Sequence, residues 1–167
     1  MNRKGFTLIE VLVVVILLGI IAVIALPRFS NASATARASM LADDLRVLRM
    51  QLAVFKGQHR GISPGYPDCD PTETATETAL AAHLTLSSNA DGETAAVGTE
   101  GYHYGPYFRE MPMNPVNGKR TVQIIGDNEA FPATGDDSHG WIYQASTLII
   151  KADSPGADEN GRAFIDY

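Results

Sequence analysis

The longest apolar run in the chain lies near its start and covers residues 6–26. It reads FTLIEVLVVVILLGIIAVIAL and contains one charged residue, Glu10. As an α-helix this run would extend about 31 Å, which matches the hydrocarbon core of a bilayer. Arg3 and Lys4 precede it, and basic residues favour the cytoplasmic side of a membrane. The pattern predicts a single transmembrane helix with a cytoplasmic N-terminus.

Two simpler interpretations of this run are a secretory signal peptide and a plain membrane anchor. A signal peptide has a shorter apolar run, of roughly 7–15 residues, followed by a small-residue cleavage site. A plain anchor would let Glu10 reach the headgroup region. Because an ionised carboxylate deep in a membrane costs up to about 2.5–3.5 kcal/mol, we interpret Glu10 as a functional residue.

A second apolar pattern follows in residues 27–56. After Pro27 the chain has no glycine or proline until Gly57, so the helix is expected to continue to residue 56. Apolar residues recur there at spacings of four and three, and Met40, Val47 and Val54 widen the face. The stripe consists of Ala34, Ala38, Leu41, Leu45, Leu48, Leu52 and Phe55. It could form a coiled coil, but it is short and a domain follows that needs a packing surface, so we favour core packing.

Residues 57–167 read as one small globular domain. Clusters of Gly, Pro, Asp, Ser and Thr predict loops over residues 57–75 and an exposed loop over 87–101, and residues 73–86 predict a short helix. Three segments rich in β-branched and aromatic residues predict strands, the last two joined by a tight hairpin at Ala145-Ser146. These strands are Thr121–Ile125, Gly140–Gln144 and Thr147–Ala152. The expected fold is α+β, with the long N-terminal helix packed on a small C-terminal antiparallel sheet, and with Trp141, Tyr143, Leu148 and Ile150 in the core.

Composition argues against several functions. The net charge of −6 does not suit nucleic-acid binding, which relies on clustered Lys and Arg. Cys69 is the single cysteine, so it makes no intrachain disulfide or zinc-finger framework; it reads as a small buried hydrophobe, with an intermolecular bridge as the alternative. The histidines have no metal-ligand spacing and read as surface or loop residues. No nucleophile elbow, P-loop or dinucleotide motif occurs, so we expect no enzyme activity.

Residues 4–11, with the sequence KGFTLIEV, closely resemble the N-terminal signal of type IV pilins and type II secretion pseudopilins. The resemblance implies that a prepilin peptidase cuts between Gly5 and Phe6 and methylates the amino group of Phe6. Residues 1–5 would then be a cleaved leader. It also implies that Glu10 pairs with the amino terminus of a neighbouring subunit during filament assembly. A carboxylate in a low dielectric needs a cation, and the new terminus is one.

Gly19 and Pro27 also match the family pattern. Glycine lets helices approach closely, and proline cannot donate to the preceding turn and so bends or loosens the helix. A simple end of the membrane segment explains Pro27 equally well.

A second resemblance lies in residues 104–115, which read YGPYFREMPMNP. They are similar to the GPYL-x-x-(L/I)P-x-(D/N)P segment of the major pseudopilins, with Phe108 in place of the leucine. An ordinary turn-rich connector is the simpler interpretation. The segment is expected to form a rigid, irregular connection against the core.

The tail after Ala152 resembles the acidic C-terminal loop through which major pseudopilins bind calcium. Asp153, Asp158, Asn160 and Asp166, with nearby carbonyl groups, are the candidate ligands, since calcium takes six to eight oxygens. The full family spacing is absent, and a solvated acidic tail is the alternative.

Together these features predict a subunit of a type II secretion pseudopilus, anchored in the inner membrane with a periplasmic C-terminal domain and extracted into an extracytoplasmic filament. Its expected partners are other copies of itself, the prepilin peptidase, the inner-membrane assembly platform and minor pseudopilins. The alternatives are a type IV pilin for adhesion, motility or DNA uptake, and a monomeric tethered binding domain.

Overall fold

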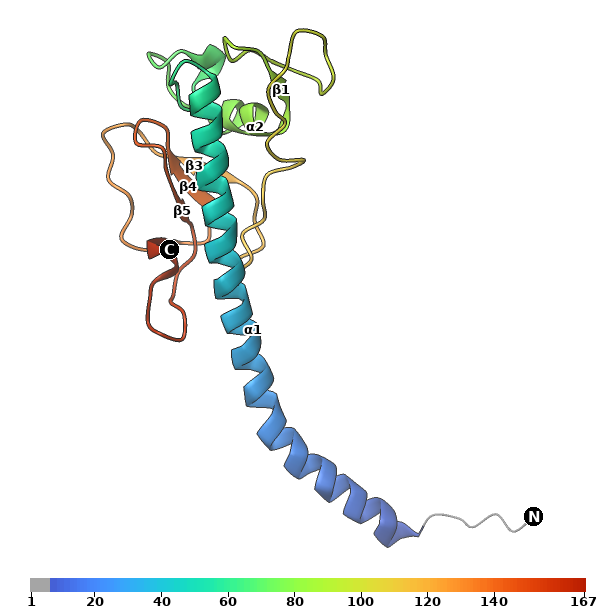
Figure 1. Cartoon of the computed structure of the whole chain (residues 1–167). Coiled ribbons are helices and arrows are strands. Elements are labelled where there is room, and N and C mark those ends of the chain that lie inside the picture. The colour runs from blue at the N-terminus through green and yellow to red at the C-terminus, as the bar shows by residue number, and fades with distance from the viewer. Residues whose placement is uncertain (1–6) are drawn as a thin grey trace, which may run out of the picture.

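The computed structural model describes residues 7–167, with the side chains of residues 7–23 and 33–167. Its main element is α1, Leu8–Gln58, a helix of 51 residues that is about 76 Å long. In Figure 1 the first half of α1 projects from the domain as a curved rod, and the second half lies along the domain. The predicted continuous helix is confirmed, and it extends two residues beyond the predicted end at residue 56.

The helix ends have specific capping interactions. Thr7 is the N-cap: its hydroxyl accepts a hydrogen bond from the Glu10 N–H, and the Glu10 side chain accepts one from the Thr7 N–H. This reciprocal arrangement satisfies two donors that the first turn cannot pair internally. At the other end the Gly61 N–H donates to the Lys56 carbonyl, and Gly61 has a φ of 79°, a conformation that glycine adopts without strain.

No helix in the described part of the chain has a stretch that is both long and apolar enough to cross a membrane.

One face of the second half of α1 supplies the core. Leu41, Leu45, Leu48, Leu52 and Phe55 are completely buried, which confirms the predicted stripe. The stripe begins at Ala38, since Ala34 is exposed. Met40 and Val54, expected to widen the buried face, are instead exposed on the outside of the helix, because the domain covers α1 from one side only.

A three-stranded sheet packs against this stripe. Its strands β3 (Val122–Ile124), β4 (Trp141–Gln144) and β5 (Ile149–Ala152) lie in the order β3-β4-β5. All three predicted strands are confirmed. The expectation of a wholly antiparallel sheet is wrong for β3, which pairs with β4 in parallel; β4 and β5 are antiparallel. The long connection between β3 and β4 returns the chain to the start of the sheet, which permits the parallel pairing.

The turn between β4 and β5 is longer than predicted. It spans residues 145–148 and has Leu148 at a φ of 59°. Trp141, Tyr143 and Ile150 are fully buried as expected, while Leu148 is partly buried against the same core.

The rest of the domain consists of helix α2, two short strands and short 3-10 turns. Helix α2, Glu77–Thr85, is shorter than the predicted 73–86 because Thr76 caps it. A Glu77 carboxylate oxygen accepts the Val122 N–H at 2.7 Å and so ties α2 to β3. Short strands β1 (Ser87–Ser88) and β2 (Thr94–Ala95) pair, and 3-10 turns occupy Pro67–Cys69 and Phe164–Asp166. The prediction of a fully exposed loop over 87–101 is wrong at its start, where both β1 serines are buried.

Residues 104–115 lie across the sheet edge as a connection fixed to the core. The Trp141 indole donates to the Pro112 carbonyl at 2.9 Å. Asn114 is completely buried and donates to the Gly140 carbonyl at 2.7 Å and to the Ser154 hydroxyl at 3.1 Å. The expected irregular connection against the core is confirmed.

Candidate assembly site

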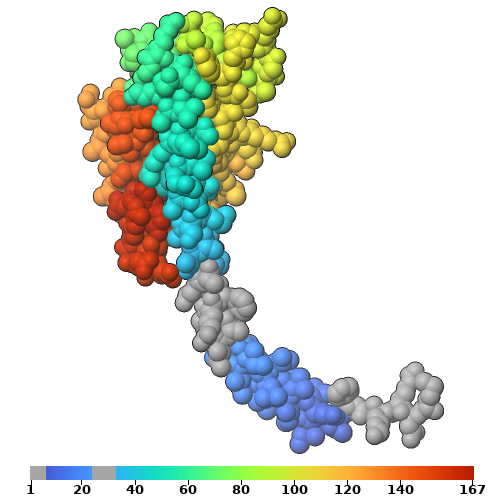
Figure 2. All heavy atoms as spheres, in the orientation of Figure 1, coloured from blue at the N-terminus to red at the C-terminus, as the bar shows by residue number. Residues whose placement is uncertain are grey.

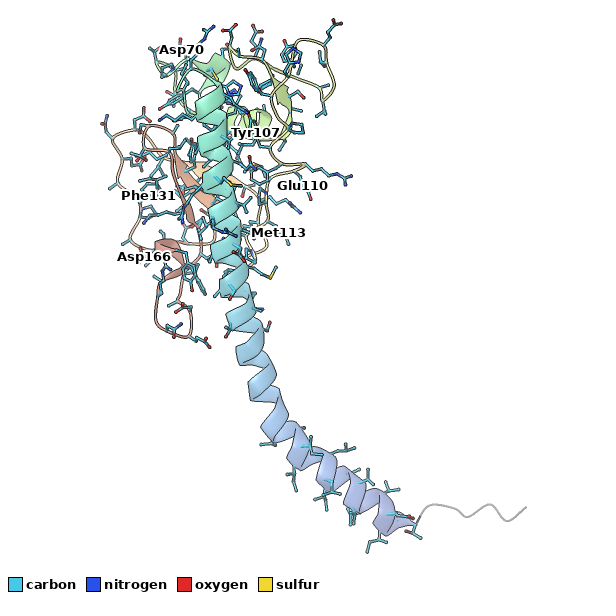
Figure 3. All side chains as sticks on the ribbon, in the orientation of Figure 1. Asp70, Tyr107, Glu110, Met113, Phe131 and Asp166 are labelled. Carbon is cyan, nitrogen blue, oxygen red and sulfur yellow. The ribbon has the colours of Figure 1, made fainter. Side chains whose placement is uncertain are left out.

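The first half of α1 presents an apolar surface that no other described segment of the chain covers. Every large apolar residue from Leu8 to Val23 is at least 49% exposed, and Leu8 reaches 85%. Figure 3 shows these side chains projecting on all sides of the helix. Soluble proteins rarely expose so large a continuous apolar surface, since its contact with water is unfavourable. This segment therefore requires lipid or other protein chains around it.

Glu10 is the one charged group on this surface in the described chain. Its Oε2 atom accepts from the Thr7 N–H at 3.2 Å and from the Thr7 hydroxyl at 3.1 Å. No cation among the described residues forms an ion pair with it. The capping box thus fixes the position of the carboxylate, and its charge has no counter-ion among the residues that the structure describes. Once the helix is surrounded by apolar groups, that charge needs a cation from outside.

The other predicted assembly residues have different surroundings. Gly5 and Phe6, the predicted cleavage site, lie outside the described residues. A Cβ atom placed on Gly19 would meet nothing within 4 Å, so the surface there is open to another helix. The backbone of α1 continues as a helix through Pro27, whose nitrogen carries no hydrogen to donate.

The outer face of the second half of α1 carries a further apolar stripe. Met40, Met50 and Val54 are 56%, 54% and 39% exposed, and Val47 lies between them on the same face. Figure 2 shows this length of α1 open along the front of the domain. Sequence reasoning assigned Met40, Val47 and Val54 to the core. Their regular spacing of seven residues was a signal for a second, separate stripe.

The four predicted calcium ligands do not form one cluster. Asp153 follows β5 and is 1% exposed, while Asp158 and Asn160 lie in a turn further along. Asp166 is exposed, with a carboxylate oxygen 3.9 Å from the Lys151 ammonium. The described chain contains no group of three or more His, Cys, Asp or Glu side chains arranged to hold a metal ion.

Two histidines lie in the core, which corrects the expectation that they are surface or loop residues. His59 and His83 are 1% and 3% exposed, and their rings pack on Phe55 with centroids 3.8 and 4.7 Å away. Both are hydrogen bonded: His83 Nδ1 accepts the Gly65 N–H at 3.1 Å, and His59 Nε2 lies 3.0 Å from the Ser88 hydroxyl.

Cys69 lies beside these histidines and is buried as a free thiol, as expected. Its sulfur is 4.0 Å from His83 Nε2. Burial raises the pKa of the Cys69 thiol to about 11, and the nearby Asp68 carboxylate adds to the rise. A thiol that resists ionisation is a poor nucleophile, so we interpret Cys69 and His83 as packed core residues.

Comparison with known proteins gives three findings. The family model described as the prokaryotic N-terminal methylation motif matches residues 1–26. The chain is 31% identical over 110 residues to the type IV narrow pilus major component PilA5 of Thermus thermophilus, covering 60% of this chain and 91% of that protein. It is 29% identical over 68 residues to the competence protein ComGC of Bacillus subtilis, covering 41% of this chain and 69% of that protein. No solved structure matches the chain significantly.

Proposed function

Because the chain belongs to the family of type IV pilins and pseudopilins, we propose that it is a structural subunit that polymerises into an extracytoplasmic filament through the first half of α1. The observation that carries this proposal is the exposed apolar segment, residues 8–23, whose one carboxylate has no ion-pair partner in the described part of the chain. Lipid covers such a surface before assembly, and neighbouring copies cover it afterwards. The family is a structural one, and we assign the chain no catalytic role.

The proposed assembly contact joins Glu10 of one copy to the amino group of Phe6 in another. Cleavage after Gly5 by a prepilin peptidase creates this amino group, and its methylation leaves a positively charged secondary amine. The Thr7 cap holds the Glu10 carboxylate at the first turn of α1, so the pairing would set the axial position of each new copy. Gly19, which has open space beside it, would permit close approach of a neighbouring helix.

Before assembly, the subunit would sit in the inner membrane as a single-pass protein with a periplasmic domain. Leu8 to Val23 supply the described part of the membrane segment, and the domain that follows α1 would lie outside. An inner-membrane assembly platform would then extract the chain, since moving the apolar segment from lipid into a bundle of like helices keeps it out of water.

Two kinds of filament are candidates. The similarity of residues 104–115 to major pseudopilins, and the way Asn114 fixes that segment in the core, favour a type II secretion pseudopilus with minor pseudopilins at its tip. The similarity to a pilus major component and to a competence protein favours a type IV pilus.

Deletion of the gene separates these two candidates. A pseudopilin deletion should block export of proteins across the outer membrane and leave surface pili intact. A pilin deletion should remove surface pili, twitching or DNA uptake and leave export intact. Complementation with the wild-type gene controls for effects on neighbouring genes. If neither export nor any pilus-dependent activity changes, the filament proposal fails and a monomeric tethered domain becomes the better interpretation.

A further inference from the structure

The C-terminal segment, residues 153–167, packs beside the second half of α1 (Figures 1 and 2). We propose that arginine side chains hold this segment closed, with Arg162 fixing its C-terminal end through charged hydrogen bonds to a backbone carbonyl. The segment would then keep its structure without calcium. This inference goes beyond the proposed function and does not depend on it.

The oxygens of Asp158 already have protein donors. Its Oδ1 atom accepts the N–H groups of Asn160 and Arg162 at 2.8 and 2.9 Å, and its Oδ2 atom accepts the Tyr167 hydroxyl. These bonds, with the Tyr167 hydroxyl first, lower the pKa of Asp158 below its usual range. A calcium ion would have to displace these donors, because their hydrogens point at the same lone pairs.

The Asp153 carboxylate likewise has protein donors on both oxygens. Its Oδ1 atom accepts the Asp136 N–H at 2.8 Å, and its Oδ2 atom accepts the Ser138 hydroxyl at 3.0 Å and the His139 N–H at 2.7 Å. This buried carboxylate therefore anchors the loop that precedes β4. The carboxylate oxygens of Asp153 and Asp158, two of the four candidate ligands, serve the protein itself, so these residues do not fit a calcium site.

Arg162 ties the middle of the segment to its C-terminal end. Its guanidinium donates to the Asp166 carbonyl through Nε at 3.2 Å and through a second nitrogen, and it lies 4.2 Å from the centroid of the Tyr167 ring. The backbone beside it is also paired: the Asp158 N–H donates to the Arg162 carbonyl at 2.9 Å. One fixed cation thus contacts a carbonyl and an aromatic face at once, both of which bind guanidinium well.

Arg49 attaches this closed segment to α1. Its guanidinium donates to the Tyr167 carbonyl at 2.8 Å and to the Ile150 carbonyl of β5 at 3.2 Å. Further along α1, the Thr35 hydroxyl donates to the Glu159 carboxylate at 2.9 Å. Among the acidic side chains of the segment, Asp166 is the one that the structure places near a cation, with a carboxylate oxygen 3.9 Å from the Lys151 ammonium.

Amide hydrogen exchange tests this proposal on the full-length chain in detergent micelles. Exchange of residues 156–167 is measured with excess EDTA and again with excess CaCl2. We expect the two rates to agree in the wild type. We also expect Arg162→Gln to speed exchange in this segment by about tenfold, because it removes the charged hydrogen bonds that close it. Arg46→Gln is the matched control, since Arg46 pairs only with Asp43 on the exposed face of α1, and it should change nothing.

Faster wild-type exchange in EDTA than in calcium would overturn the proposal and restore the metal site. Unchanged exchange in Arg162→Gln would overturn the role of the arginine. Should that variant fail to fold, the wild-type comparison still decides the metal question. Tyr167→Phe then tests the closure, because it removes only the hydroxyl bound to Asp158.

Discussion

Acidification should destabilise this protein through His83 in particular. The imidazole lies in the core beside Phe55 and Cys69 and is 3% exposed. Burial, helped by the neighbouring His59, lowers the pKa of His83 to about 4, against smaller opposing effects of the Gly92 backbone and Asp68. The folded protein therefore keeps this ring neutral at pH values where a solvated histidine is already protonated.

The sign and size of the effect follow from the difference between the two states. In the unfolded chain His83 takes up a proton near its ordinary pKa of 6.5, whereas the folded chain takes it up only near 4. Between these values the unfolded state binds more protons, so the free energy of unfolding falls as the pH falls. A shift of this size corresponds to about 3 kcal/mol at pH 4, with the full stability present above pH 6.5.

Urea unfolding between pH 7 and pH 4 measures this effect, with the fluorescence of Trp141, the single and fully buried tryptophan, as the signal. The test compares wild type with His83→Gln, whose side chain has no charge at any of these pH values. The unfolding free energy of wild type minus that of the variant should fall by about 3 kcal/mol as the pH drops from 7 to 4. His103→Gln, on an exposed loop, is the control for the added glutamine.

The pKa values of Asp136 and Asp158 are held below the usual carboxyl range, so their contribution to folding stability is lost only at more acidic pH. That loss is the same in wild type and in His83→Gln. A wild-type minus variant difference that stays constant from pH 7 to pH 4 would refute the reasoning.

Two further predictions concern packing and use the same unfolding assay. Leu45→Ala should cost about 3 kcal/mol, because Leu45 is completely buried, whereas Met50→Ala on the exposed face of the same helix should change stability by less than about 0.5 kcal/mol; equal effects would contradict the one-sided packing of α1. Gly92→Ala should cost more than Gly98→Ala. Both glycines have φ near 90°, but a Cβ on Gly92 would lie 2.0 Å from the Cys69 sulfur, while Gly98 has open space. Equal losses of stability in the two variants would show that the positive φ, and not the contact with Cys69, determines the cost of the substitution.

The sequence predicted the helical part of the fold well because α1 repeats one simple pattern. A 21-residue apolar run and apolar residues spaced four and three apart both indicate a helix. Each buried residue of the stripe from Leu41 to Phe55 was identified. The pattern gave the spacing of apolar residues but not which of two stripes the domain would cover. Met40 and Val54 were therefore placed on the wrong side.

Sheet topology and the buried polar groups were harder to predict, because both depend on contacts between distant segments. Nothing local to β3 reports a parallel partner, since the return of the chain before β4 decides the pairing. His83 is buried because α2 places its ring against Phe55 and the loop at Gly65 closes over it; a single histidine in the sequence does not indicate either contact. The acidic tail likewise suggested a metal site by composition, while the donors that occupy Asp153 come from residues 136–139.

Filament yield in a Glu10→Gln strain tests the central claim most directly. Sheared filaments and membrane fractions are quantified by immunoblot, with Glu100→Gln, on an exposed loop, as the control. We predict that membrane levels stay normal while the subunit content of filaments falls by more than about tenfold, because an unpaired cation is left among apolar helices. The control should match wild type. Normal filaments from the Glu10→Gln subunit would contradict the account.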